Sequence, residues 1–232
     1  MIEVQRLAKY FGKFSALRDL SISVSRGEFI ALFGRNGAGK TTFLRILAGL
    51  CRPSSGMIRI GESRPLPALA ARGAMGYLSH NTALYADLTA LENLRFYSQL
   101  HSLPCGDEEL EERIRRVGLA GRSREPVRNY SRGMQQRLAI ARAFMHDPDI
   151  LLLDEPFTGL DQAGTDFLKK YLAEAHSRGK TCLMAIHDAP LGHELADRLV
   201  VIEKGIVALD LEKNTTSLET FQDQYRALAE ER

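Results

Sequence analysis

A short glycine-rich segment carries the clearest chemical pattern in the sequence. Residues 34–41 read Gly-Arg-Asn-Gly-Ala-Gly-Lys-Thr, the full spacing G-x-x-x-x-G-K-T. Glycines let backbone N–H groups converge on phosphate oxygens, because side chains would block that approach. Lys40 is expected to reach the β- and γ-phosphates of a nucleotide, and the Thr41 hydroxyl to ligate Mg²⁺. The segment predicts a phosphate-binding loop, against the alternative of a glycine-rich turn with an incidental lysine. The expected nucleotide contacts are Gly34, Asn36, Gly37, Ala38, Gly39, Lys40, Thr41 and Thr42.

Two adjacent carboxylates form the second chemical feature. Asp154 and Glu155 follow the apolar run of residues 150–153. Such a run predicts a buried strand, and its last residues lie at the carboxyl edge of the sheet, where ligands of open α/β folds bind. Asp154 would hold Mg²⁺ directly or through a water, and Glu155 would polarise the water that attacks the γ-phosphate. Acidic residues often end strands for other reasons, so the two carboxylates indicate catalytic roles only in combination with the phosphate-binding loop.

Strand, loop and helix must follow one another to position these residues. Residues 29–33 form a continuous apolar run, the pattern of a strand that is covered on both faces. After the loop, residues 41–50 place Phe43, Leu44 and Leu47 at helical spacing, and Pro53 stops the helix. This order is the context that a phosphate-binding loop requires.

The remaining elements fall into blocks along the chain. The first sixty residues read as short strands, and residues 88–146 read as successive helices, of which 107–117 is the clearest. Strands at 150–153, 182–186 and 199–202 and a helix at 167–176 then return to an α/β pattern. We expect a parallel-sheet core that a helical insertion interrupts. Residues 217–232 predict a polar helix that frays.

Composition limits the class of protein. The chain has 232 residues, 44% hydrophobic and 26% charged, with a net charge of +2, which is too small to favour nucleic acid as a partner. Three scattered cysteines (Cys51, Cys105, Cys182) have no CxxC spacing, so neither a disulfide framework nor a metal site is expected. The first residues lack the layout of a signal peptide, and no apolar run approaches the roughly 18 residues that span a bilayer. The chain is therefore expected in the cytosol.

A third motif, at residues 129–137, makes the pattern specific. It opens a predicted helix whose N-cap is Ser131. Residues 130–135 resemble the signature motif of ABC ATPases, usually written LSGGQ. Arg132 replaces the first glycine of that motif, so the resemblance rests on Ser131, Gly133 and residues 135–137. An ordinary capped helix is the alternative.

The resemblance implies roles for single residues. Phe11 resembles the aromatic residue that stacks on adenine, with a core residue at a strand edge as the alternative. Asp161, in Gly159-Leu160-Asp161, resembles the D-loop aspartate that takes part in the nucleotide site. His187 resembles the switch histidine that contacts the γ-phosphate, although lone histidines are more often structural.

One position departs from the family pattern. Where the family normally has glutamine, this chain has His80. An imidazole is a poorer ligand for Mg²⁺ than an amide oxygen, because hard cations prefer oxygen. The metal contact is expected to pass from His80 through water or to fall to Asn81.

The resemblance covers residues 2–210 and implies the ABC ATPase fold. That fold is a RecA-like phosphate-loop NTPase core with N-terminal antiparallel β strands and an inserted helical subdomain. Residues 1–232 would form one domain, with its core at 1–84 and 148–232 and its helical subdomain at about 85–147. The implied cofactors are ATP and Mg²⁺.

The implied partners are a second copy of the chain and a membrane-spanning permease. Two copies would meet head to tail, so that Ser131 and Gly133 of one complete the γ-phosphate site held by Lys40 of the other. The subunit would lie peripherally on the cytoplasmic face of the inner membrane.

Residue strings at 88–94 and 154–161, together with His80, resemble the ATP-binding subunit of the bacterial haem exporter for cytochrome c maturation. Similar strings occur in subunits of drug, lipid and polysaccharide exporters. A soluble ABC ATPase of translation or DNA repair usually carries two cassettes or a long coiled-coil insertion, and neither is present. A regulatory subunit without turnover would lack the carboxylate of Glu155.

Overall fold

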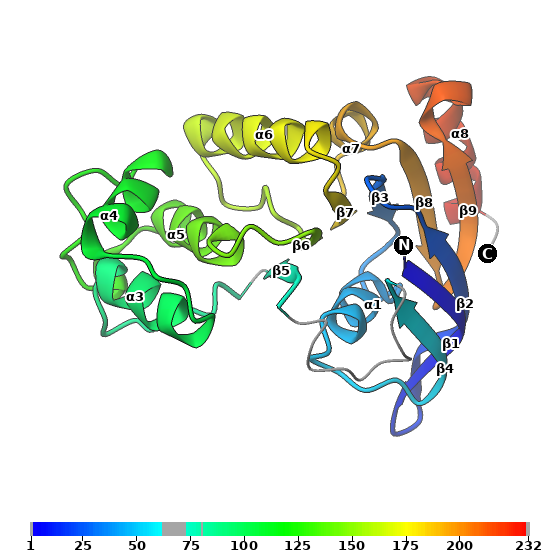
Figure 1. Cartoon of the computed structure of the whole chain (residues 1–232). Helices are drawn as coiled ribbons and strands as arrows, with labels where there is room; N and C mark the ends of the chain where they lie inside the picture. The colour runs from blue at the N-terminus through cyan, green and yellow to red at the C-terminus, as the bar shows by residue number, and fades with distance from the viewer. Residues whose placement is uncertain (1, 62–72, 80, 231–232) are drawn as a thin grey trace.

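The computed structural model describes residues 2–61, 73–79 and 81–230, and these form two sheets flanked by helices (Figure 1). A three-stranded antiparallel sheet has the order β2-β1-β4, and a six-stranded sheet has the order β5-β6-β7-β3-β8-β9. The smaller sheet consists of β1 (Ile2–Phe11), β2 (Phe14–Val24) and β4 (Ser55–Ile60). The larger consists of β3 (Phe29–Phe33), β5 (Met75–Leu78), β6 (Ile150–Asp154), β7 (Thr181–Ala185), β8 (Arg198–Glu203) and β9 (Ile206–Glu212).

Parallel pairing in the larger sheet gathers the ends of three strands. β3, β6 and β7 are buried at every residue, as expected for strands covered on both faces. β7 lies between β6 and β3, and Ala185 is the register partner of both Asp154 and Leu32. The segments that follow these strands therefore leave the same edge of the sheet. β9 alone pairs antiparallel, with β8.

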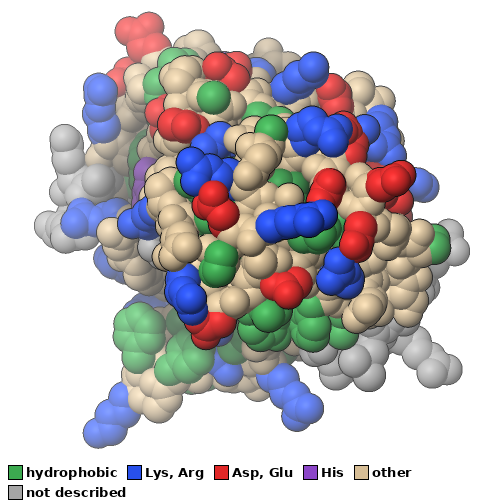
Figure 2. Space-filling view, turned by 90° about the vertical axis from the view of Figure 1, so that its left-hand side faces the viewer, with side chains coloured by type: hydrophobic (Ala, Val, Ile, Leu, Met, Phe, Trp, Pro, Cys, Tyr) green, Lys and Arg blue, Asp and Glu red, His purple; other side chains and the backbone are tan. Residues whose placement is uncertain are grey.

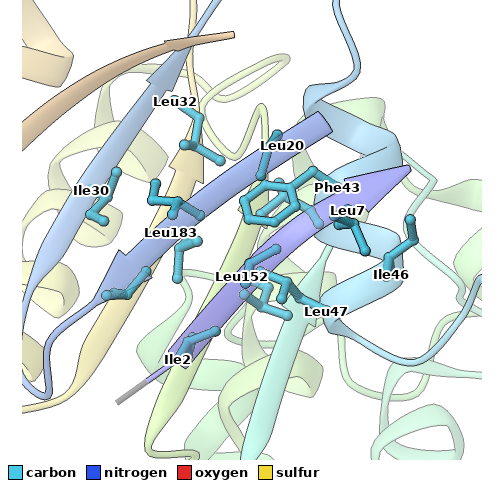
Figure 3. Packing of buried hydrophobic residues seen from close by; sticks show 14 of the residues in the cluster. Ile2, Leu7, Leu20, Ile30, Leu32, Phe43, Ile46, Leu47, Leu152 and Leu183 are labelled. Atoms are coloured by element: carbon cyan, nitrogen blue, oxygen red, sulfur yellow. The ribbon is translucent and has the colours of Figure 1, made fainter. Parts of the chain in front are cut away.

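Helices cover both faces of this sheet. α1 (Lys40–Leu47) packs between the two sheets, where Phe43 meets Leu7 and Leu20 in a dry core (Figure 3). The opposite face packs against helices α5 (Arg132–Phe144), α6 (Gln162–Ser177), α7 (Ala189–Leu195) and α8 (Leu218–Glu230).

A third core lies among α3 (Ala90–Leu100), α4 (Asp107–Arg116) and α5, at the end of the molecule away from the smaller sheet (Figure 1). Leu94, Leu110 and Leu138 are fully buried there. Basic and acidic side chains are interspersed on the face of this end that Figure 2 shows. Within α4, Arg113 pairs with Glu109 at 2.8 Å. Among the described residues, no helix combines the length and apolar character needed to cross a membrane.

The boundaries of two helices differ from the predicted ones. α1 ends at Leu47 rather than Leu50. α6 begins at Gln162 rather than Phe167, because the Asp161 carboxylate accepts the Gly164 N–H at 2.9 Å and fixes the first turn. The helix predicted near the end of the chain is present as α8, but the prediction of a polar helix is wrong, because Phe221 is fully buried. Short 3₁₀ turns occupy Val127–Asn129 and Lys213–Thr215.

Candidate functional site

The glycine-rich loop lies between β3 and α1, and its glycines serve different purposes. Gly34 has φ 140°, and a Cβ there would collide with the Ile202 carbonyl. Gly39 has φ 114°, and a Cβ there would lie 2.6 Å from the Ala16 carbonyl oxygen. Gly37, with φ 81°, has no atom within 4 Å of its Cβ position. Close packing thus requires glycine at the two ends of the loop, whereas the middle of the loop faces open space.

Lys40 is buried under this loop, with 6% of its surface exposed. Its Nζ donates to the Gly34 carbonyl at 2.5 Å and to the Arg35 carbonyl at 3.2 Å. Burial lowers the pKa of Lys40, and the nearby carboxylates of Glu155 and Asp154 oppose that shift. An anionic ligand would compensate the buried ammonium.

Thr41 and Asp154 bring two oxygen ligands together. The Thr41 hydroxyl donates to Asp154 Oδ1 at 2.9 Å, and Asp154 is 5% exposed at the end of β6. Adjacent hydroxyl and carboxylate oxygens suit a hard divalent cation. Burial and the neighbouring Asp154 raise the pKa of Tyr77 to about 12, so its phenol stays neutral beside this pair. The donor set fits Mg²⁺.

Glu155 and His187 form a second pair beside the first. Glu155 Oε1 lies 2.8 Å from His187 Nε2, and the Glu155 N–H donates to the Ala185 carbonyl at 3.0 Å. The Glu155 backbone has φ 52°, the left-handed region that non-glycine residues seldom occupy. This conformation turns its side chain toward His187, whereas the Asp154 side chain faces Thr41. The exposed part of the Glu155 carboxylate is available to a water.

A hollow of about 170 Å³ lies over the loop. Phe14, Arg35 and Glu155 line it together with the residues of the loop itself. Phe14 was missed from the sequence. The hairpin of β1 and β2 was the signal that could have indicated Phe14, because Phe11 and Phe14 are register partners where the two strands meet. Phe11 is 52% exposed, and the Lys9 ammonium lies 4.8 Å from its ring centroid.

Ser131 and Gly133 belong to a different surface of the chain. Ser131 caps α5 by accepting the Met134 N–H at 3.3 Å. A Cβ on Gly133 would lie 3.1 Å from the Gly159 carbonyl oxygen, so the start of α5 packs on the segment that leads to Asp161. Arg137 reaches Asp161 at 3.7 Å. Among the described residues, neither Ser131 nor Gly133 lines the hollow over the loop.

A larger hollow, of about 550 Å³, opens beside the Thr41–Asp154 pair. Its lining includes Arg45, Tyr77, Asn81 and Arg142. The Arg142 guanidinium donates to the Tyr77 carbonyl at 3.2 Å and stacks over the Tyr97 ring at 5.0 Å. His80, the residue expected at the metal, lies outside the described residues.

Comparison with known proteins gives consistent results. A family model described as ABC transporter matches residues 17–158. The uncharacterized ABC transporter ATP-binding protein YdbJ of Bacillus subtilis (strain 168) is 36% identical, over 95% of this chain and 72% of its own length. The sulfate/thiosulfate import ATP-binding protein CysA 2 of Rhizobium meliloti (strain 1021) is 37% identical over 89% of this chain, which spans 58% of that longer relative.

A solved structure confirms the predicted fold class. The dimeric post-hydrolysis state of the ATP-binding cassette MJ0796, bound to ADP and Pi, superposes with a TM-score of 0.82 at 25% identity. The match covers 92% of this chain and 99% of that one. The two chains therefore share the same arrangement of sheets and helices.

Proposed function

Because this chain belongs to the ATP-binding subunits of the ABC transporter family and is an ATPase that uses ATP with Mg²⁺, we propose that it powers a transporter and that one chain supplies half of each hydrolytic site. The proposal rests on one observation above all. Two consecutive carboxylates lie at the edge of the glycine-rich loop with different partners. Asp154 pairs with Thr41 at 2.9 Å, and Glu155 pairs with His187 at 2.8 Å.

Lys40 binds and orients the terminal phosphates in this proposal. Its ammonium exchanges the carbonyl oxygens of Gly34 and Arg35 for phosphate oxygens, which carry more negative charge. The loop glycines and the N-terminus of α1 add backbone N–H groups around the phosphates. Thr41 and Asp154 would hold Mg²⁺, which would supply charge neutralisation for the phosphates when bound.

Glu155 orients the attacking water and accepts its proton in this proposal. His187 contacts Glu155 Oε1, and Oε2, which accepts the Thr158 hydroxyl at 3.5 Å, can accept the water as well. In this proposal the imidazole of His187, which lies beside Glu155, also contacts the γ-phosphate. Hydrolysis then proceeds by positioning and electrostatic stabilisation, as phosphoryl transfer generally does.

A second copy of the chain completes the site. Ser131 and Gly133 lie at the exposed start of α5, away from the hollow of their own chain among the described residues, so they serve the nucleotide of a partner. The comparison structure of MJ0796 is a dimer, which supports a head-to-tail pair here.

The partner in the membrane docks at the large hollow beside Thr41 in this proposal. The adjoining surface carries the exposed rings of Tyr85 and Phe96, which stack edge to face at 5.1 Å, and the exposed side chain of Leu100. Exposed aromatic clusters favour a protein interface. The subunit would sit on the cytoplasmic face of the inner membrane through this contact.

Cargo and direction belong to the permease. One relative is named for sulfate/thiosulfate import, whereas the strings at residues 88–94 and 154–161 resemble those of the ATP-binding subunit of the haem exporter. Haem export is the specific hypothesis. The Soret absorbance of a permease purified together with this chain tests it, because a haem permease would retain haem and a sulfate permease would not.

The direct test of the enzymatic proposal is Glu155→Gln. The amide keeps the size of the side chain but does not accept the proton, so ATP turnover is expected to fall by at least roughly a hundredfold. Binding of MgATP is expected to persist. The matched control is Glu108→Gln on the exposed face of α4, which should leave turnover unchanged.

Two results would count against these roles. Turnover above about a tenth of the wild-type rate would remove Glu155 from the mechanism. A wild-type chain that binds MgATP but never hydrolyses it, alone or with a permease, would instead favour a regulatory nucleotide-binding subunit.

A further inference from the structure

The last helix carries an apolar face toward the end of β3. Phe221, Tyr225 and Leu228 are spaced i, i+4 and i+7 along α8, and they pack on the core cluster that contains Phe33. Ser217 starts the helix by accepting the Thr220 N–H at 3.1 Å. Figure 1 shows α8, in red, beside the sheet that contains β8 and β9. None of the proposed catalytic roles uses this helix.

Phe33 is fixed from two sides. Its ring lies 4.7 Å from the Phe221 ring and 6.1 Å from the Tyr225 ring, and those two rings are themselves 5.8 Å apart and nearly parallel. On the other side lies Gly192 of α7, where a Cβ would collide with the Phe33 ring. Phe33 is the last residue of β3, so this packing determines where the glycine-rich loop begins.

Tyr225 also touches the loop itself. Burial raises the pKa of the Tyr225 phenol, whereas an interaction with the Gly34 backbone opposes that shift, so the phenol remains neutral beside the loop. The Gly34 carbonyl in turn receives Lys40 Nζ at 2.5 Å. One glycine, which by itself has wide backbone freedom, thus connects α8 to the lysine of the phosphate site.

We propose that α8 is a brace for the phosphate loop and that Phe221 and Tyr225 are positioning residues for nucleotide binding. The inference rests on the proposed nucleotide site. Gly34 sets the orientation of the carbonyl that holds Lys40, and Phe221 and Tyr225 restrict Gly34. Without the brace, part of the binding free energy of the phosphates goes into ordering the loop, so affinity falls whereas the chemistry of the bound nucleotide does not change.

The experiment compares MgADP affinity of the wild-type chain with that of Tyr225→Phe, which removes only the hydroxyl. Loss of the interaction between this hydroxyl and the Gly34 backbone is expected to weaken binding roughly three- to tenfold. KM for ATP should rise by a similar factor, with kcat changed by less than about twofold. The control is Tyr171→Phe, a partly buried tyrosine that stacks on Phe144 on the α5–α6 side, where no change is expected.

A second measurement needs no variant. Because coupling between sites is reciprocal, MgADP should order α8 as α8 orders the loop. Hydrogen exchange of residues 218–230 in the wild-type chain should therefore slow when MgADP is added. This measurement decides the question if Tyr225→Phe fails to fold.

The outcomes separate the two proposals. A wild-type chain that binds MgADP, with Tyr225→Phe binding equally well, overturns the brace and leaves the proposed function intact. Unchanged exchange of residues 218–230 on binding also overturns the brace. A wild-type chain that binds no MgADP overturns the proposed function, and the brace with it. A smaller rise of KM for ATP in Tyr225→Phe than in Tyr171→Phe would likewise contradict the brace.

Discussion

Two neighbouring carboxylates in this chain have different surroundings, and the backbone between them is the cause. Asp154 ends a strand with its side chain buried against the Thr41 hydroxyl. Glu155 takes a left-handed conformation, φ 52°, and turns to His187. Non-glycine residues in this region cost of order 1 kcal/mol, and such strain concentrates at functional sites. One residue therefore suits a metal ion and the next suits a water.

Substitution of single residues can test which aromatic side chain, Phe14 or Phe11, stacks on the base of the nucleotide. Phe14 lines the hollow over the loop, whereas the ring of Phe11 is occupied by the Lys9 ammonium. We expect Phe14→Ala to weaken MgATP binding by roughly tenfold, the worth of one aromatic stack, and Phe11→Ala to weaken it by less than about twofold. Titration calorimetry on both variants measures this. A larger loss of affinity in Phe11→Ala than in Phe14→Ala would instead favour Phe11, the residue that the family resemblance indicated.

At the scale of elements, the strand-loop-helix unit was predictable because its signals are local. The apolar run of residues 29–33, the glycine spacing and the spacing of Phe43, Leu44 and Leu47 each act within one stretch of chain. Contacts between distant stretches were not predictable. Phe14 reaches the hollow only because β1 and β2 form a hairpin, and Phe221 is buried only because α8 returns to Phe33. The i, i+4, i+7 spacing in α8 was the available signal for burial.

A histidine pair joins three elements and makes their packing depend on pH. His101 follows α3 and His146 follows α5, and their rings stack at 4.2 Å. His146 Nε2 lies 3.1 Å from the Met75 carbonyl of β5. Burial, with a smaller effect from Arg142, lowers the pKa of His101. Burial, His101 and Arg142 lower the pKa of His146, although the Met75 carbonyl and Asp147 oppose the shift.

Because both pKa values are lower in the folded chain, the unfolded chain binds more protons below the ordinary histidine pKa of about 6.5. The free energy of unfolding should therefore fall as the pH drops from about 7.5 to about 5.5. In His101→Phe, which keeps a ring in the stack but does not titrate, this fall should be smaller. Urea midpoints at both pH values measure it. Equal falls in the two proteins would show that the pair does not couple to folding.

At the scale of the whole molecule, we propose that one chain presents two incomplete halves of a catalytic site. The loop, Asp154, Glu155 and His187 gather at one edge of the larger sheet, and Ser131 and Gly133 stand at the start of α5 beside Gly159 and Asp161. Helical packing around α3, α4 and α5 holds the second half as a separate cluster. The proposal of an ATPase that works as a head-to-tail pair is consistent with this arrangement.

The most direct measurement mixes two damaged chains, each carrying Glu155→Gln to prevent turnover. One chain adds Lys40→Ala and the other adds Ser131→Arg. In a head-to-tail dimer, both lesions of the mixed pair fall in one site, and the other site pairs an intact Lys40 with an intact Ser131. We predict about one trapped ATP per mixed dimer and almost none in dimers of either chain alone. A mixed dimer that traps no ATP would contradict a site shared between two chains, because Ser131 would then serve the nucleotide of its own chain.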